Sequence, residues 1–346
     1  MEEWKEYKLG DVLTIKYGKD HKQLADGDIP IYGSGGIMRY GERSLYDGPS
    51  ILIPRKGSLN NVIYADKPFW TVDTMFWSII NDSIANPLFV YYSICKKDFA
   101  SLNVGSAVPS LTVPVIEDID ILLPSKATQD KVVSVLKSLD DKIELNRHIN
   151  DNLEQQAQAL FNEMFPHITE GENMIGDLIM PKRGKGLLSK NAIKGDIPVV
   201  AGGIEPATYH NQANTTAPVL TIAASGANAG YINLWYIPVW ASDSSYIDDS
   251  ITPNVYFWYI MLKKRQQEIF DAQVGSAQPH IYPKHIAELP MNVVFVEKIA
   301  EYNEIVTPIF EKKGQLFLES KRLTSLRDTL LPKLMSGELK INDINN

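Results

Sequence analysis

Two halves of this chain carry the same short motifs in the same order. The paired segments are KLGDVLTIKYGK and MIGDLIMPKRGK (8–19 and 174–185), GDIP (27–30 and 195–198), a glycine after an apolar run (57 and 226), VGSA (104–107 and 274–277) and Leu-Pro (123–124 and 289–290). Partners are always separated by 166 to 170 residues. Each match alone is weak, but their shared order and spacing predict a duplicated architecture.

Each half ends in a long helical pattern. From Gln129 to Met164 there is no proline or glycine, and apolar residues return every three or four positions. Adding 170 to each position of this seam gives a second seam. The two seams are 132, 136, 139, 143, 146, 150, 153, 157, 160, 164 and 302, 306, 309, 313, 316, 320, 323, 327, 330, 334. This 3.5-residue spacing is typical of a coiled coil. Two unrelated amphipathic helices are the alternative.

Irregularities in the two seams carry further expectations. Polar residues near the middle of each seam are expected to fix the register at some cost in stability. They are Asn146, Asn150, Lys313 and Ser320. Pro308 and Gly314 predict either a kink or a late start for the second helix.

About 120 residues rich in glycine, proline and aromatic side chains precede each helix, with short strand-like runs such as 50–54 and 218–223. The predicted fold is therefore α+β. Two α/β domains are each followed by a long helix, and the two helices form a coiled coil, with an internal repeat. The expected segments are 1–124, 125–165, 166–290 and 291–346.

Composition limits the function classes. A single cysteine, Cys95, excludes an internal disulfide and a multi-cysteine metal site. The longest apolar runs are far shorter than a membrane span, and MEEWKEYKLG has no secretory pattern, so we expect a cytoplasmic protein without membrane contact. With 34 basic and 42 acidic residues, the net charge of −8 does not by itself predict a nucleic-acid partner.

Short motifs that suggest catalysis are incomplete. NPLF at 86–89 is one residue from the adenine-binding loop of amino-methyltransferases, but no glycine-rich loop precedes it, so we interpret it as a helix cap. The E-x-K segments at 6–8 and 338–340 lack the partner acid of a nuclease. His280 and His285 have no third metal ligand nearby. A stand-alone DNA-modifying enzyme stays an alternative. So does a coiled-coil scaffold whose tryptophans (70, 77, 235, 240 and 258) bind carbohydrate or peptide.

The long helices carry a resemblance to a known family. LPSKATQDKVVSVLKSLDDKIELNRHINDNLEQQAQALFNEMF (123–165) resembles the central conserved region of type I restriction–modification specificity subunits. LRDTLLPKLMSGEL (326–339) resembles their distal conserved end, and WKEYKLGDVLTIKYGK (4–19) resembles the opening of a target-recognition domain. The resemblance extends over the whole chain, although Phe295 and Val296 replace the usual Glu-Gln before the second helix.

The resemblance implies a non-catalytic subunit that recognises a bipartite sequence in double-stranded DNA. Residues 1–124 and 166–290 would be its target-recognition domains. The helices would separate these domains by forming an antiparallel coiled coil with a pseudo-two-fold axis. They would also dock two modification subunits that carry adenine-DNA methyltransferase activity with S-adenosylmethionine. Restriction subunits would add ATP- and Mg-dependent translocation and cleavage. No cofactor or metal is expected in this chain.

Candidate DNA contacts are basic or amide residues in glycine-flanked loops, where backbone can approach DNA. They are Lys19, Lys22, Ser34, Arg39, Arg43, Arg55 and Lys56 in the first half, and Lys182, Arg183, Lys185, Lys190, Lys194, His210 and Asn228 in the second. For each one, an ordinary surface residue is the alternative. We favour Arg39 and Arg55 for base contact, because arginine binds guanine with two hydrogen bonds. The VGSA segments are interpreted as structural turns.

Apolar residues outside the seam are candidate contacts for the modification subunits, because the intramolecular pair would leave them uncovered. They are Leu145, Phe161, Phe165, Phe310, Phe317 and Leu331.

The expected coiled coil predicts how target spacing is set. One heptad inserted into both helices lengthens each by about 10 Å at ~1.5 Å per residue. At ~3.4 Å per base pair, the unrecognised gap between half-sites should grow by about three base pairs. The half-site sequences should stay the same. Methylome sequencing of the insertion variant checks this, and an unchanged gap would show that the helices do not set the spacing.

Overall fold

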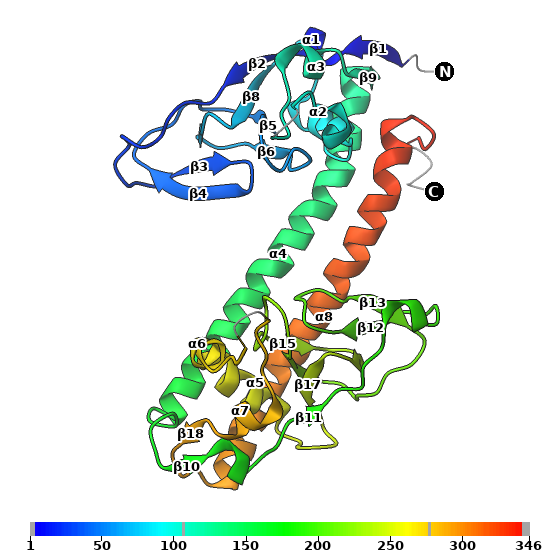
Figure 1. Cartoon of the computed structure of the whole chain (residues 1–346). Helices are drawn as coiled ribbons and strands as arrows, with labels where there is room; N and C mark the ends of the chain where they lie inside the picture. Colours follow the sequence, from blue (N-terminus) through cyan, green and yellow to red (C-terminus); the bar gives the residue numbers. More distant parts are fainter. Residues whose placement is uncertain (1–3, 106–107, 276–277, 341–346) are drawn as a thin grey trace. The chain divides into compact units, whose positions relative to one another are not determined.

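The computed structural model describes residues 4–105, 108–275 and 278–340. The chain forms two units: unit 1 comprises residues 1–143 together with 322–346, and unit 2 comprises residues 144–321. Two long helices, α4 (Lys126–Met164) and α8 (Val296–Met335), each contribute to both units (Figure 1). The boundary between the two units therefore falls within each long helix, whereas the segments expected from the sequence contained each helix as a whole.

Unit 1 contains a small α/β domain of nine short strands. Its elements are β1 (Lys5–Lys8), α1 (Leu9–Val12), β2 (Leu13–Tyr17), β3 (Ile29–Gly33), β4 (Gly36–Gly41), β5 (Ser50–Pro54), β6 (Ile63–Ala65), β7 (Trp70–Thr71), β8 (Met75–Ile80), α2 (Pro87–Ile94), η1 (Phe99–Leu102), α3 (Val113–Glu117) and β9 (Asp120–Leu123). Its three sheets have the strand orders β2-β8-β5-β6, β4-β3-β7 and β1-β9.

Unit 2 contains a second α/β domain with the same strand order. Its elements are β10 (Asn173–Met174), η2 (Ile175–Asp177), β11 (Lys182–Arg183), η3 (Ser189–Asn191), β12 (Ile197–Val200), β13 (Thr208–His210), β14 (Val219–Ala223), β15 (Ile232–Trp235), β16 (Trp240–Ala241), β17 (Ser244–Ile247), α5 (Val255–Lys264), α6 (Gln266–Asp271), α7 (Pro283–Ala287) and β18 (Pro290–Met291). Its sheets are β11-β17-β14-β15, β13-β12-β16 and β10-β18. The predicted internal repeat is confirmed strand by strand.

Local sequence explains where these elements begin. All five residues of β5 and all five of β14 are buried, as expected for continuous apolar runs covered on both faces. Pro87 occupies the first turn of α2, and the Asn86 side chain accepts hydrogen bonds from the amides of Leu88 and Phe89 at 2.9 and 3.3 Å. The NPLF motif is therefore a helix cap.

The core of unit 1 is completed by both long helices. Val132 and Leu136 of α4 and Leu331 and Leu334 of α8 are buried in one apolar cluster with α2. Leu331, which we expected to be uncovered for a partner, is only 4% exposed. That prediction is wrong because α2 covers the outer side of the helix.

The core of unit 2 is an aromatic cluster on the same two helices. Phe161, Phe165 and Phe310 were also expected to face a partner, and they are 0%, 5% and 0% exposed. Phe161 and Phe165 pack against Phe257 of α5 with ring centroids 5.5 and 5.2 Å apart. The prediction is wrong for these three residues because α5 fills the space beside the seam. Only Leu145 and Phe317 of the six candidates are exposed, at 51% and 45%.

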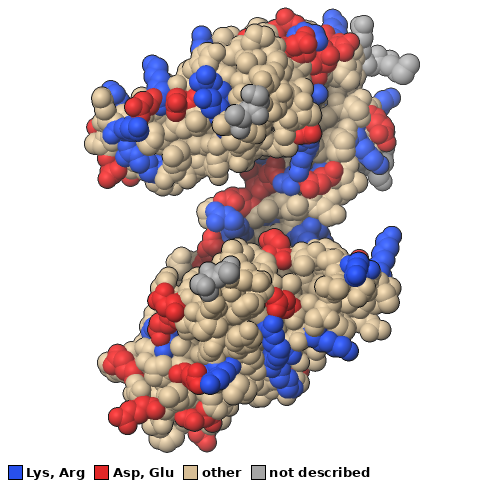
Figure 2. Space-filling view, in the orientation of Figure 1, with Lys and Arg blue, Asp and Glu red and all other residues tan. Residues whose placement is uncertain are grey.

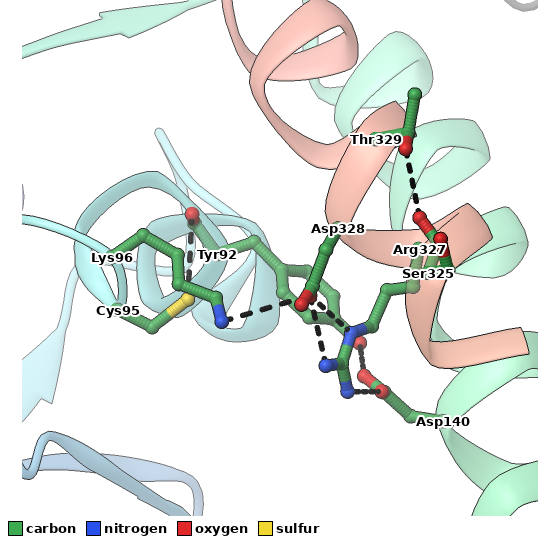
Figure 3. A network of polar contacts seen from close by, with 8 residues as sticks. All are labelled: Tyr92, Cys95, Lys96, Asp140, Ser325, Arg327, Asp328 and Thr329. Atoms are coloured by element: carbon green, nitrogen blue, oxygen red, sulfur yellow. Dashed lines mark hydrogen bonds and ion pairs between the residues drawn. The ribbon is translucent and has the colours of Figure 1, made fainter. Parts of the chain in front are cut away.

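A polar network joins the first α/β domain to both helices within unit 1 (Figure 3). The Tyr92 hydroxyl of α2 donates to Asp140 of α4 at 2.5 Å, and Arg327 of α8 donates to the same carboxylate at 2.8 Å. Arg327 also pairs with Asp328, which lies 3.6 Å from the Lys96 ammonium. Burial and the bond to Asp140 raise the pKa of Tyr92, so it remains a neutral donor.

The seam in unit 2 contains buried polar pairs. Lys313 is 8% exposed and forms an ion pair with Glu154, which also accepts a hydrogen bond of 2.8 Å from the Tyr259 hydroxyl. Asn146, fully buried, donates to Glu319 and Ser320 at 2.8 and 3.2 Å. Partner numbers fall along α8 as they rise along α4, so the helices run antiparallel, as predicted.

Helix α8 starts earlier than expected. It begins at Val296 and continues for 40 residues through Pro308 and Gly314, so the late start is wrong. Gly314 is explained by its neighbour, because a Cβ there would lie 2.7 Å from the Tyr236 ring. Neither α8 nor any other helix in the described ranges has the length and apolar character needed to cross a bilayer.

The Glu154–Lys313 pair predicts an acid-sensitive seam. Burial alone would raise the pKa of Glu154, but Lys313 and two hydrogen bonds outweigh it and leave the pKa below its ordinary value. Its contribution to stability should therefore be complete above pH ~4.3 and be lost as the pH falls through the lowered folded-state pKa. Glu154→Gln should lower the free energy of unfolding by about 3 kcal/mol at pH 7, because it leaves Lys313 buried without a counterion.

Denaturant unfolding of both proteins between pH 7 and pH 3 measures this difference, which should shrink in acid. The matched control is Glu144→Gln, which removes an exposed carboxylate that pairs with Arg147 and should cost well under ~1 kcal/mol. A pH-independent difference for Glu154→Gln would contradict the assignment.

Candidate nucleic-acid interface

The two paired glycines form equivalent turns after β5 and β14. Gly57 and Gly226 have φ values of +86° and +81°, a region that favours glycine. Each amide donates to a proline carbonyl in a later loop, Pro109 at 3.3 Å and Pro279 at 3.1 Å. A Cβ on Gly226 would meet no heavy atom within 4 Å. The backbone conformation, and not crowding, requires glycine there, and the space in front of the turn is open.

The VGSA segments lie beside these turns. The Val104 amide donates to the Ser110 carbonyl and the Val274 amide to the His280 carbonyl, both at 3.0 Å. These bonds close each loop next to its glycine turn, as expected for structural turns. Residues 106–107 and 276–277 lie outside the described residues.

In unit 1, Arg55 lies beside the turn. Its guanidinium is 5.4 Å from the ring centroid of Tyr17, which is itself 56% exposed. The only hydrogen bond that the described residues offer its side chain is a 3.4 Å contact with the Asp73 carbonyl. In the described ranges no carboxylate pairs with Arg55. The guanidinium thus lies over the ring, with donors left for a ligand.

In unit 2, the cation beside the turn is Arg183. It forms an ion pair of 2.5 Å with Asp243, and both side chains are 40% exposed. The other carboxylate oxygen of Asp243 accepts a hydrogen bond from Ser225, the residue before Gly226. This network fixes the orientation of the guanidinium at the second turn.

The remaining candidates of unit 1 differ in their surroundings. Lys19, Lys22 and Lys56 are exposed, and Arg43 is exposed with its guanidinium 5.8 Å from the Trp70 ring centroid. Ser34 is half-buried, and its Oγ would lie 2.8 Å from a Cβ on Gly57. Ser34 is therefore beside the turn.

Arg39 is occupied inside unit 1. It donates to the carbonyls of His21 and Leu24 at 2.8 Å, to the His21 ring at 3.3 Å and to Asp26 at 2.9 Å. The expectation that it contacts a base is not supported. Its role is to fasten residues 21–26 to strand β4, a contact between positions far apart in sequence.

In unit 2, Lys182, Lys185, Lys190 and Lys194 are exposed, and Lys182 donates to the Ser250 hydroxyl at 3.1 Å. Asn228 is half-buried and follows Gly226 by two residues. His210 is 6% exposed, accepts a hydrogen bond from the Ile193 amide at 3.0 Å and packs against Trp240. The prediction that His210 contacts DNA is therefore wrong, because its side chain is buried between Trp240 and the loop at Ile193.

Charge is mixed over the surface. On the face shown in Figure 2, lysine and arginine side chains alternate with aspartate and glutamate over both units. Across the described ranges, no group of three or more His, Cys, Asp or Glu residues could hold a metal ion. Arg55, Arg183 and their fixing groups thus stand out by geometry more than by local charge.

Tyr17, Ser225 and Asp243 were not among the candidate site residues expected from the sequence. A signal for the first was present: the aligned segments 8–19 and 174–185 place Tyr17 opposite Arg183. No sequence pattern indicates that Ser225 and Asp243 lie near Arg183. They are brought together by the pairing of β11 and β14 with β17.

Comparison with known proteins gives a consistent result. Residues 1–155 match the type I restriction modification DNA specificity domain. A putative type I specificity subunit of Mycoplasma pneumoniae is 26% identical, over 96% of both chains. The MjaIX type I restriction enzyme specificity subunit of Methanocaldococcus jannaschii is 24% identical, over 98% of this chain and 89% of the relative. A solved type I S subunit from M. genitalium is 21% identical with a TM-score of 0.65, covering 96% of both chains, which supports the fold.

The surroundings of Arg39 predict a structural role. Arg39→Met should lower the free energy of unfolding by about 1–3 kcal/mol, because two backbone carbonyls and Asp26 lose their donor. Arg43→Met, which removes one exposed cation–π contact, should change it by less than ~0.5 kcal/mol. Thermal unfolding of both variants measures the contrast, and equal effects would refute the role assigned to Arg39.

Proposed function

Because this chain is a type I restriction–modification specificity subunit, we propose that its two α/β domains each recognise one half of a bipartite DNA target. The supporting observation is that one nine-strand scaffold occurs twice with different side chains around the same glycine turn. Identical heads would recognise identical half-sites. Domains that differ beside the same turn, as at the equivalent positions Lys56 and Ser225, suit two unequal elements.

Affinity and specificity would come from different groups. Exposed lysines near the turns, such as Lys56 and Lys185, suit phosphate contacts, which position a protein without sequence preference. The net charge of −8 limits this term. Other subunits of the complex would therefore supply part of the positive surface.

The chemistry would lie in the other subunits. We propose two modification subunits that use S-adenosylmethionine, and restriction subunits that use ATP and Mg, all meeting DNA in the cytoplasm. Leu145 and Phe317 are the exposed helix residues that would serve as contacts for the modification subunits.

Most of the residues on which the alternative functions depended are used inside the fold. Asn86 caps α2, so it does not form the adenine-binding loop of a methyltransferase. Trp70, Trp77, Trp235 and Trp258 are at most 9% exposed, so they do not form platforms for carbohydrate.

Methylome sequencing tests the proposal. A host that carries the modification subunits should methylate one bipartite motif with this chain and lose that motif without it. An unchanged methylome would contradict the proposal. Calorimetry on the isolated chain is the second measurement, since clear binding of S-adenosylmethionine would instead support a stand-alone enzyme.

A further inference from the structure

The two glycine turns can be compared position by position, because the sheets around them share one register. Tyr17 pairs with Phe76 in unit 1, and Arg183 pairs with Ser245 in unit 2. On the other side of the same strand, Ile53 pairs with Phe76, and Ile222 pairs with Ser245. Tyr17 and Arg183 therefore occupy the same position in the two domains.

The second pair of positions follows from the backbone. The Arg55 amide donates to the Thr74 carbonyl at 2.8 Å, and the Ala224 amide donates to the Asp243 carbonyl at 3.1 Å. Arg55 corresponds to Ala224, and Thr74 corresponds to Asp243. Arg55 and Ala224 each lie two residues before the glycine of the turn. Thr74 and Asp243 lie opposite them, just before the next strand.

The arginine comes from a different strand in each domain: Arg55 follows β5, whereas Arg183 lies on β11. In unit 1 it comes from Arg55 and lies over Tyr17, whose position is that of Arg183. In unit 2 Arg183 provides it directly, and Ala224 leaves the position of Arg55 without a long side chain. Each domain thus places one arginine head group at the start of β8 or β17, beside a glycine turn with positive φ, which is open in unit 2 and bordered by Ser34 in unit 1.

The surroundings favour a base over a phosphate as the ligand. Asp243 beside Arg183 would repel a phosphate, but it holds one edge of the guanidinium and leaves the other edge for a neutral acceptor. Tyr17 likewise lies against the Arg55 guanidinium, which keeps donors beyond its 3.4 Å contact with the Asp73 carbonyl. A fixed, planar fork matches the O6 and N7 acceptors of guanine.

Resting on the proposed function, we propose that Arg55 and Arg183 each recognise a guanine, so that both half-sites contain a G·C pair at the equivalent place on their own domain. The two elements of the target would then differ elsewhere and share this pair. The two guanidinium groups are equivalent in space, although Arg55 and Arg183 are not aligned residues of the repeat.

The test uses the chain assembled with its modification subunits and a library of randomised half-sites. Arg55→Lys keeps the charge and removes the fork. It should lower the discrimination for G·C roughly ten- to hundred-fold at one base pair of one half-site. Arg183→Lys should do the same at one base pair of the other half-site. Lys56→Ala is the matched control and should weaken methylation for all sequences alike.

A transplant separates recognition from structural support. Tyr17→Arg combined with Arg55→Ala, Lys56→Ser and Thr74→Asp gives unit 1 the arrangement of unit 2. This variant should retain the G·C requirement that Arg55→Ala alone loses.

The inference is overturned if Arg55→Lys weakens methylation uniformly, if it relaxes a pair other than G·C, or if the transplant loses the G·C requirement as Arg55→Ala does. In the first two cases a bipartite motif would still depend on this chain, and the proposed function would stand. If the complex with the unsubstituted chain methylates DNA without preference for any motif, the proposed function itself is refuted.

Discussion

Leu331 and Leu334 lie near the end of the chain, yet they are buried against Val132 and Leu136 in the core of unit 1. Likewise, the core of unit 2 needs Ala157 and Phe161 from α4 together with Tyr302 and Phe310 from α8. Neither α/β domain closes its apolar core alone. Burial of such side chains stabilises by roughly 1.5–3 kcal/mol each, so the pairing of the helices and the folding of the domains are coupled. A domain held in this way can present loops whose own sequences contribute little to stability.

Polar groups give that pairing its register. Glu154 with Lys313 and Asn146 with Ser320 can meet only if the helices are antiparallel and correctly aligned, because a shift would leave charge or amide groups buried without partners. In unit 1 the network of Asp140, Arg327 and Tyr92 extends the same logic from the helices to α2. Under the proposed function, the loops that would contact base edges are thus attached to packed helices, as such contact requires.

Duplication leaves each domain free to change its contacts. The glycine turn, the strand register and the loop closed by Pro109 or Pro279 are the same in both units, since they serve the backbone. Side chains around the turn differ, since they face open space. An arginine head group can therefore be supplied from β11 in one domain or from the residue after β5 in the other without altering the sheet, and under the proposed function this freedom would allow one scaffold to recognise two sequences.

The sequence by itself determined the repeat and the two seams, because periodic burial leaves a regular signal in residue type, and its resemblance to a known family implied the antiparallel pairing. It also placed Tyr17 opposite Arg183. Only the tertiary structure decided that Arg39 is bound within its own domain and His210 is buried, that four of the six apolar helix residues belong to the cores, and that Asp243 and Ser225 hold Arg183. The physical reason is that a helix pattern records which residues are apolar but not which neighbour covers them, and strand pairing joins residues that are 60 positions apart.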